Sequence, residues 1–350
     1  MRLLDGRDSG DSTEIDQAID AARVGGDTGR LAFLQTLKEQ TGRRDTELLY
    51  LDLAPDQYAV AIGHLAAARH IAVLVPGVAG DADQCAVLNW IPYARAIHTA
   101  CQAEGAASAV IMWKGYQDPT PEQAWSTRFA AAGGASLAAF CEGLARDRQQ
   151  TLTVIGHSYG SLVTGLALAD HGLRPTNVIA LGSPGMGVDR LAELHLRPEQ
   201  FFTESASGDP ITALGFFGTD PSAPGFGGTR MSTGRRRSRP SPTLHSAYFA
   251  PGSDSLRNIV DVVIGKFDRV TAVPPGHGDH CCVVVHAILN PFQDRLDTFV
   301  RRYSGRGAGL LSVVVHVDDL VANLAGDGAR IATDETVLLG RQLLGFAGYL

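Results

Sequence analysis

The stretch TLTVIGHSYGSLVTGLALAD, residues 151–170, contains the strongest fold signal in the sequence. It begins as a short apolar run, passes through a tight turn of small residues and continues as an apolar helix. At the turn, Gly156-His157-Ser158-Tyr159-Gly160 matches the G-x-S-x-G pattern in the strand–turn–helix context that this pattern requires. Larger side chains in place of the glycines would collide with the adjoining strand and helix. Because the turn raises the Ser158 hydroxyl above the sheet edge, we predict that Ser158 is a nucleophile.

The alternative interpretation of the turn is a glycine-rich connection that carries a serine by chance. That interpretation leaves His157 and the flanking glycines unexplained. The nucleophile interpretation also gives the backbone amide of Tyr159 a role, since an N–H group at a helix N-terminus can stabilise a developing oxyanion.

Further apolar runs on both sides of this stretch alternate with helical patterns. The runs are ASAVIMW (107–113), TLTVIG (151–156), NVIALG (177–182) and EQFFTES (199–205), and the helical stretches cover roughly 89–104, 121–147 and 159–171. Runs without polar residues at alternate positions suit strands that are covered on both faces. We therefore predict an α/β fold with a mostly parallel central sheet flanked by helices.

The chain outside this alternation divides into two further segments. Residues 12–24 and the stretch TGRLAFLQTLKEQTG have helical apolar spacing, and β-type runs begin at residue 46. We expect an N-terminal helical segment at 1–45, an α/β domain at 46–274 and a C-terminal extension at 275–350. Residues 215–244 are rich in Gly, Pro, Ser and Arg, which predicts a long loop and a candidate lid.

A serine nucleophile needs a base, and the base needs an orienting acid. In a fold of this kind the acid follows the serine in the chain, and the loop after the run at 199–205 offers Asp209. Asp189, after the preceding run, and Glu204, within the run itself, are rivals. A turn aspartate before a proline is the alternative role for Asp209.

For the base we predict His245, in TLHSAYF, because it follows the long loop and precedes a helix that begins near Ser253. A hydrogen-bonded loop histidine is the alternative. The competing histidines fall in the C-terminal segment, beyond the expected last core helix; they are His277, His280 and His286.

A second oxyanion donor should come from the loop after the run that ends at Val75. In VLVPGVAGDAD, Gly77 permits a sharp turn and the amide of Val78 can point at a carbonyl oxygen. An ordinary turn between strand and helix is the alternative. Candidate pocket residues are Gly77, His157, Trp113 and Tyr116, together with Asp118 from WKGYQDP, although the aromatic residues fit a packing role equally well.

These pieces together resemble a known family. The set VLVPG, W-x-GY-x-x-P, VIGHSYGS, GSPG, GDP and HSAYF, in this order across residues 46–270, resembles the α/β-hydrolase superfamily and, within it, a bacterial family of unknown function. The resemblance implies an α/β-hydrolase fold and a Ser-Asp-His triad at Ser158, Asp209 and His245. The tail after residue 275 and the Arg-rich insertion before His245 depart from the motifs.

Composition excludes several classes of function. The chain of 350 residues has a formal net charge of −7, which argues against coating of nucleic acid or anionic membrane. It has no signal-peptide pattern at its start and no apolar stretch long enough to span a bilayer. Five scattered cysteines show no disulfide-scaffold spacing. We expect a cytoplasmic protein without an integral membrane segment.

Two further features do not indicate a ligand. HGDHCCVVVH (277–286) contains metal-ligand residue types, but adjacent cysteines on a strand point to opposite faces, so we expect no metal. GRRRSR (234–239) suits a solvated loop better than an anion site. We expect no cofactor.

The sequence thus predicts a serine hydrolase of the esterase or lipase-like kind, acting on a small-molecule acyl ester through an acyl-enzyme. Thioester or amide cleavage and acyl transfer use the same intermediate and stay open. A non-catalytic binding module on the same scaffold is the alternative from another class. Acyl-chain length and oligomeric state are not predicted.

Overall fold

One eight-stranded sheet organises the computed structural model, which describes residues 10–53, 57–78, 88, 90–119, 123–124, 126–144, 149–209, 211–213, 216–234 and 242–273. The sheet order is β1-β2-β4-β3-β5-β6-β7-β8. The strands are β1 (Thr46–Asp52), β2 (Gln57–Ile62), β3 (His70–Val75), β4 (Ser108–Lys114), β5 (Thr151–His157), β6 (Asn177–Leu181), β7 (Phe201–Glu204) and β8 (Thr229–Arg230).

The part of the sheet with the order β4-β3-β5-β6-β7-β8 is parallel. In contrast, β1 pairs with β2, and β2 with β4, in antiparallel register. Every residue of β4 and β6 is buried, as expected for apolar strands covered on both faces. The predicted mostly parallel sheet is confirmed. Its parallel strands end at one edge, and that edge carries the site described below.

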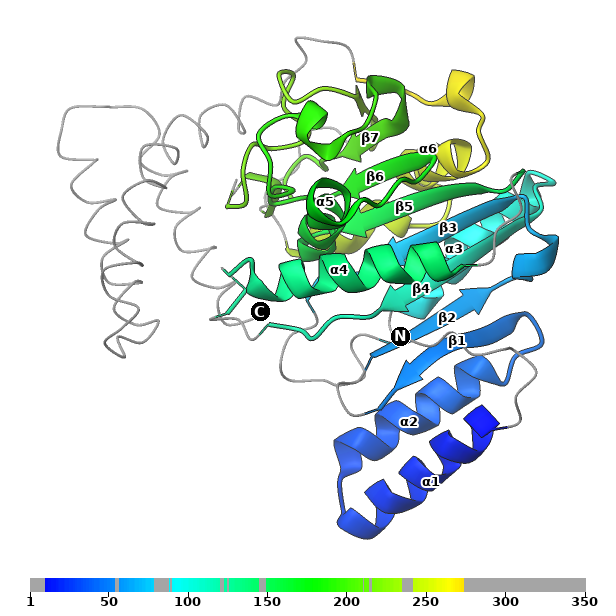
Figure 1. The fold of residues 1–350 in the computed structure, drawn as a ribbon. Coiled ribbons are helices and arrows are strands. Elements are labelled where there is room, and N and C mark those ends of the chain that lie inside the picture. The colour runs from blue at the N-terminus through cyan, green and yellow to red at the C-terminus, as the bar shows by residue number, and fades with distance from the viewer. Residues whose placement is uncertain are drawn as a thin grey trace, which may run out of the picture.

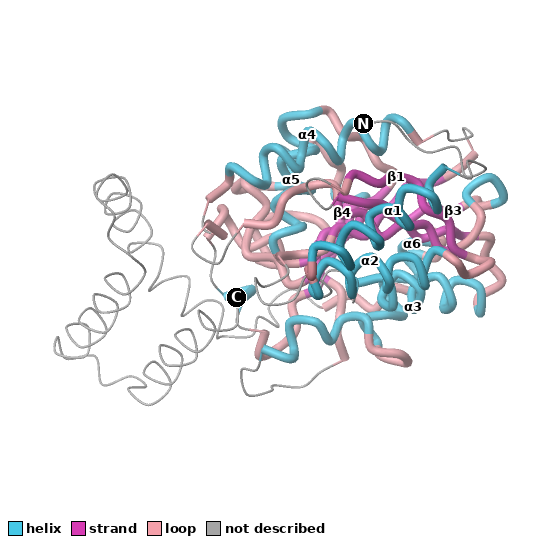
Figure 2. The backbone as a smooth tube through the Cα atoms, turned by 90° about the horizontal axis from the view of Figure 1, so that it is seen from below, coloured by secondary structure: helices cyan, strands magenta, loops and turns pink. Residues whose placement is uncertain are grey.

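Helices form a layer on each face of the sheet (Figures 1 and 2). They are α1 (Gly10–Gly25), α2 (Thr28–Thr41), α3 (Trp90–Ala103), α4 (Arg128–Gly143), α5 (Tyr159–His171) and α6 (Asp254–Val263). In Figure 2 the helices α4 and α5 lie on one side of the strands, and α1, α2, α3 and α6 lie on the other. Short 3-10 helices connect these elements; they are η1 (Leu65–Ala67), η3 (Leu191–Leu194), η4 (Pro198–Gln200), η5 (Ile211–Ala213), η6 (Pro242–Phe249) and η7 (Phe267–Arg269).

Two apolar clusters hold these layers together, one on each face of the sheet. On one face, Leu137 and Phe140 from α4 join the same cluster as Trp113 from β4. On the other, Ile15 and Leu34 from the first two helices join strand residues. The two predicted N-terminal helices therefore share a core with the sheet, and the boundary at residue 45 stays a prediction.

The segment 215–244 differs from the loop that its composition predicts. Residues 216–234 fold back onto the sheet, Thr229 and Arg230 form β8 beside β7, and Phe217 and Phe226 are buried. The short strand escapes pattern reading because its pairing depends on tertiary contact rather than on apolar alternation. Residues 235–241 and 274–350 lie outside the described residues. They contain the arginines of GRRRSR, the C-terminal extension and the stretch HGDHCCVVVH, for which we expected no metal. Among the described helices, none has the length and apolar character to cross a bilayer.

Candidate active site

Ser158 lies at the turn from β5 into α5 with a backbone φ of 54° and ψ of −130°. Positive φ is uncommon for a residue with a side chain and marks a strained backbone. The neighbouring glycines have a steric cause: a Cβ on Gly160 would lie 2.3 Å from the Val75 carbonyl oxygen, and one on Gly156 would lie 2.7 Å from the Ser161 Cα. The G-x-S-x-G spacing is therefore required by packing at this turn.

A chain of hydrogen bonds holds the Ser158 backbone. The Ser158 amide donates to the Leu181 carbonyl oxygen (2.9 Å), which ties the turn to the end of β6. The Ser161 hydroxyl is 2.6 Å from the Ser158 carbonyl oxygen and 2.6 Å from the Ser183 hydroxyl, which accepts from the Gly185 amide (3.1 Å). A hydroxyl has one proton to donate and the amide can only donate. The chain therefore runs from Gly185 through Ser183 and Ser161 to the Ser158 carbonyl.

His245 and Asp209 form a hydrogen-bonded pair. The His245 Nδ1 atom lies 3.0 and 2.9 Å from the two carboxylate oxygens of Asp209, whose side chain is completely buried. The Ile211 amide (3.0 Å) and the Tyr248 hydroxyl (2.6 Å) also donate to this carboxylate. Burial alone would raise the pKa of Asp209, but His245 and these donors hold it below its usual value, so the carboxylate stays ionised.

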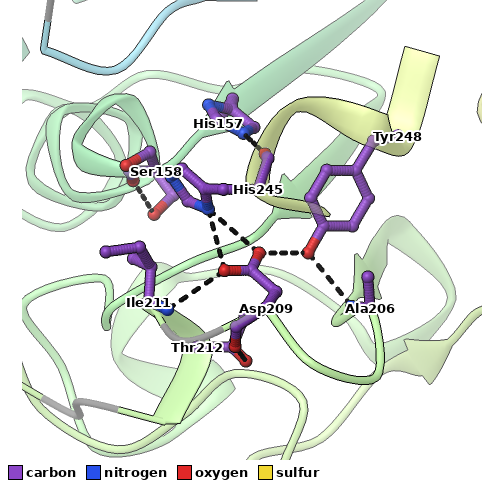
Figure 3. Close-up of polar contacts among 9 residues, drawn as sticks. His157, Ser158, Ala206, Asp209, Ile211, Thr212, His245 and Tyr248 are labelled. Atoms are coloured by element: carbon purple, nitrogen blue, oxygen red, sulfur yellow. Dashed lines mark hydrogen bonds and ion pairs between the residues drawn. The ribbon is translucent and has the colours of Figure 1, made fainter. Parts of the chain in front are cut away.

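The structure brings His245 and Asp209 together with Ser158 at one edge of the sheet (Figure 3). The imidazole of His245 lies between Asp209 and Ser158, and its second ring nitrogen faces the serine. No hydrogen bond joins the Ser158 hydroxyl to the His245 ring among the described residues, and such contacts often tighten only when a substrate binds. Gly182 lies directly against this pair, since a Cβ there would be 2.9 Å from the Asp209 Oδ2 atom and 3.1 Å from the His245 ring.

The rival acids lie elsewhere. Asp189 is exposed and accepts two hydrogen bonds from Thr219. Glu204 is buried and pairs with the Ser255 hydroxyl, and burial raises the pKa of its carboxyl well above 4.5. The partner of Glu204 is therefore a hydroxyl and not an imidazole. The rival histidines at 277, 280 and 286 lie outside the described residues.

His157 is buried behind His245 rather than exposed to a cavity. Its Nε2 atom donates to the His245 backbone carbonyl oxygen (2.5 Å), and the two imidazole rings lie 4.5 Å apart. Burial, with the His245 ring nearby, lowers the pKa of His157 to about 3. A neutral His157 adds no positive charge beside His245 when that ring becomes protonated. The Trp90 ring packs against His157 at 4.7 Å.

The loop after β3 approaches the serine closely. A Cβ on Gly77 would lie 2.7 Å from the Ser158 Cβ and 3.1 Å from its hydroxyl oxygen, so Gly77 permits this approach. Val78 follows as a half-buried residue. The Tyr116 hydroxyl donates to the Pro76 carbonyl oxygen (2.8 Å) and so fixes the loop from the side.

The remaining predicted residues have specific partners in the fold. Tyr159 is buried, its hydroxyl donates to the Ser126 carbonyl oxygen (2.6 Å), and its amide begins α5. Trp113 is completely buried beside Phe140. Asp118 forms an ion pair with the buried Lys114. No group of histidines, cysteines or carboxylates that could hold a metal exists within the described part of the chain.

Sequence reasoning missed Tyr248. Its ring is buried and its hydroxyl reaches the candidate acid, yet in HSAYF it resembles an ordinary core aromatic residue. Its spacing of three residues from His245 was a signal that could have found it, because residues three apart lie on one face of a 3-10 helix.

An α/β sheet that places a strained serine, an imidazole and a carboxylate at the carboxyl ends of its strands defines a class, the α/β hydrolases. A family model described as "Alpha/beta hydrolase" matches residues 55–218. The chain is 32% identical over 232 residues to the uncharacterized protein Rv0963c of Mycobacterium tuberculosis, covering 59% of this chain and 86% of that protein. The chain belongs to the α/β-hydrolase family.

Further similarities cover only part of a longer relative or have low structural overlap. The chain is 31% identical over 251 residues to the uncharacterized protein Rv2079 of M. tuberculosis, covering 61% of this chain but 38% of the other. It is also similar to the crystal structure of a carboxylesterase from Mesorhizobium loti, with 16% identity, 62% and 98% of the two chains covered and a TM-score of 0.36. The structure of TT1662 from Thermus thermophilus is similar with 19% identity, 49% and 79% coverage and a TM-score of 0.33.

Proposed function

We propose that the chain is a serine hydrolase that cleaves carboxylic esters through an acyl-enzyme, with Ser158 as nucleophile, His245 as general base and Asp209 as orienting acid. The observation that carries the proposal is the bond from His245 Nδ1 to the buried Asp209 carboxylate, with the opposite ring nitrogen facing Ser158 (Figure 3). A bond at Nδ1 fixes the imidazole tautomer and leaves Nε2 free to accept a proton.

In the first half of the reaction, His245 Nε2 accepts the proton of Ser158 while the serine oxygen bonds to the acyl carbon. The imidazolium is stabilised by the Asp209 carboxylate, whose low pKa keeps it ionised. The imidazolium then donates the proton to the leaving oxygen as the ester C–O bond breaks. An alcohol departs and the acyl group stays on Ser158.

The second half reverses the roles with water. His245 accepts a proton from a water molecule, whose oxygen bonds to the acyl carbon. The serine oxygen leaves with the proton returned by His245, and a carboxylic acid is released. Both tetrahedral intermediates place a negative oxygen where two backbone amides can reach it, and we assign these amides to Tyr159 and Val78. The close approach of Gly77 to Ser158 supports the second assignment.

Half-exposure of the nucleophile agrees with a role in catalysis. Ser158 and His245 are partly accessible to solvent, whereas Asp209 and His157 are buried. The Ser158 hydroxyl can therefore meet a substrate, while the Asp209 charge that orients His245 is shielded from water. Electrostatic interactions are stronger in such a buried environment than in water.

The test is covalent labelling with a serine-directed fluorophosphonate, read by mass spectrometry of the peptide that carries residue 158. We expect stoichiometric labelling of the native chain, none in Ser158→Ala, and at least a hundredfold slower labelling in His245→Ala. Ser232→Ala is the matched control, since it removes a serine hydroxyl outside the site, one that accepts from the Gly234 amide, and keeps the proposed nucleophile. Labelling in Ser158→Ala equal to that of the native chain would overturn the assignment, and an unreactive native chain would favour a binding module.

A second experiment defines the substrate. Hydrolysis of p-nitrophenyl esters of increasing acyl length distinguishes a small open acyl site from a lipase-like one. Matched thioester and anilide substrates test the alternative leaving groups, since all of them share the acyl-enzyme. We expect the ester to be cleaved fastest.

A further inference from the structure

Tyr248 bridges the backbone and the candidate acid. Its hydroxyl oxygen lies 2.6 Å from the Asp209 Oδ2 atom and 3.0 Å from the Ala206 amide nitrogen, and the residue is 1% exposed. A backbone amide can only donate, so the phenol accepts from Ala206. The single phenol proton must therefore point at the carboxylate of Asp209.

The bond joins two segments of different origin. Asp209 follows β7, whereas His245 and Tyr248 both lie on η6, three residues apart. Residues at this spacing eclipse one another on a 3-10 helix. One short helix thus presents both the imidazole and the phenol to the same carboxylate, and Figure 3 shows the imidazole reaching it from the side of Ser158 and the phenol from the side of Ala206.

The surrounding titratable groups leave Tyr248 as a neutral donor. Burial raises the pKa of Tyr248 well above 10, and the Asp209 charge raises it further. Glu204 adds a smaller effect in the same direction, whereas His157 is neutral because its pKa is about 3. Asp209 is therefore the charge that the phenol serves, with His245 as the other polar side chain on that carboxylate.

We propose that Tyr248 is a positioning residue of the active site, which fixes the orientation of the Asp209 carboxylate and limits how strongly that carboxylate holds the His245 ring. The inference rests on the proposed function, because it assigns Tyr248 a role in the same acid–base pair. Tyr248 does not touch the substrate in this assignment. Its effect reaches the His245 ring through two hydrogen bonds, one from Tyr248 to Asp209 and one between Asp209 and His245.

Removing the phenol proton has two consequences for the pair. The carboxylate loses one of its donors and becomes a stronger acceptor, so it stabilises the protonated His245 ring more. The acidic limb of the pH profile of kcat/KM should then move to higher pH. The carboxylate also loses a fixed orientation, which should lower kcat while KM stays unchanged.

The first experiment compares Tyr248→Phe with the native chain, with rates normalised to the fraction that a fluorophosphonate labels. We expect kcat to fall about tenfold, because a hydrogen bond to a charged group is worth roughly that factor. We expect the acidic limb to rise by about half a pH unit. Tyr58→Phe is the matched control, since Tyr58 is equally buried and lies on β2, which contributes no residue to the site.

A second variant does not depend on the stability of Tyr248→Phe, which leaves the Ala206 amide without its partner. Site-specific replacement of Tyr248 by 3-fluorotyrosine keeps the ring and both bonds but gives a more acidic phenol and so a stronger donor. The acidic limb should then move in the opposite direction, to lower pH. A purely structural role would change the labelled fraction or the melting temperature and leave both limbs in place.

The outcomes separate this inference from the function on which it rests. Opposite shifts in the two Tyr248 variants, with Tyr58→Phe unchanged, support the positioning role. If the native chain is labelled at Ser158 but both Tyr248 variants keep the native kcat and acidic limb per labelled site, the role of Tyr248 is refuted and the hydrolase stands. If the native chain is not labelled at Ser158, the proposed function itself fails.

Discussion

Replacing Gly77 by alanine tests how closely the loop after β3 approaches the nucleophile. The added methyl carbon would lie 2.7 Å from the Ser158 Cβ, whereas carbon atoms in contact normally lie about 3.5–4.0 Å apart. The loop or the serine must therefore move by about 1 Å. Both neighbours are backbone-fixed, because Tyr116 holds Pro76 and Leu181 holds the Ser158 amide.

A displacement of that size would separate the Val78 amide from the oxyanion that we propose it stabilises. Misplacement of a reacting group by 1 Å costs roughly a hundredfold in rate, so we expect kcat/KM of Gly77→Ala to fall about 100-fold. The assay is hydrolysis of p-nitrophenyl acetate, with circular dichroism and the melting temperature as measures of folding.

Gly225→Ala is the matched control, since a Cβ there would meet nothing within 4 Å. We expect it to behave as the native chain. A folded Gly77→Ala variant with activity within twofold of the native chain would contradict this prediction, because the loop would then not lie against the serine.

Three further predictions concern residues around the pair. His157→Leu removes the bond to the His245 carbonyl, so labelling of Ser158 should slow about tenfold. The pH midpoint of the labelling rate should not change, because the pKa of His157 is about 3, and a changed midpoint would contradict this prediction. Tyr116→Phe frees the Pro76 carbonyl and should lower kcat about fivefold at constant KM in steady-state kinetics, whereas a change in KM alone would place Tyr116 in substrate binding. The raised pKa of Glu204 favours the folded state fully below about pH 4.3, and this stability is lost as pH rises toward the folded pKa. Glu204→Gln should therefore gain stability over the native chain by about 1.4 kcal/mol per pH unit across that window in urea unfolding, and parallel stability curves would show that Glu204 is ionised.

The central strands were predictable because an apolar run without polar alternation is a local signal in the sequence. Apolar runs that lack polar alternation predict β4, β5 and β6 to within one residue at either end, and the helix predicted at 159–171 coincides with α5. The predicted helix at 121–147 is wrong at both ends, because α4 spans only Arg128–Gly143. Helix ends are poorly fixed by apolar spacing, since capping and tertiary contacts decide them.

The site was predictable only as a set of candidates. Chain order offers Asp189, Glu204 and Asp209 as acids, and the sequence contains nothing that measures which carboxylate faces an imidazole. Burial and pairing supply that information: Asp209 contacts His245, Glu204 contacts Ser255 and Asp189 is exposed.

The bond from His157 to the His245 carbonyl joins residues 88 positions apart in the chain. During synthesis, residue 245 must therefore leave the ribosome before its carbonyl oxygen can accept a hydrogen bond from His157. During refolding from denaturant, recovery of circular dichroism can precede recovery of reactivity, because the helical signal needs only neighbouring contacts. The return of fluorophosphonate labelling at Ser158 would then report the formation of the last tertiary contacts, whereas circular dichroism would report the formation of the helices.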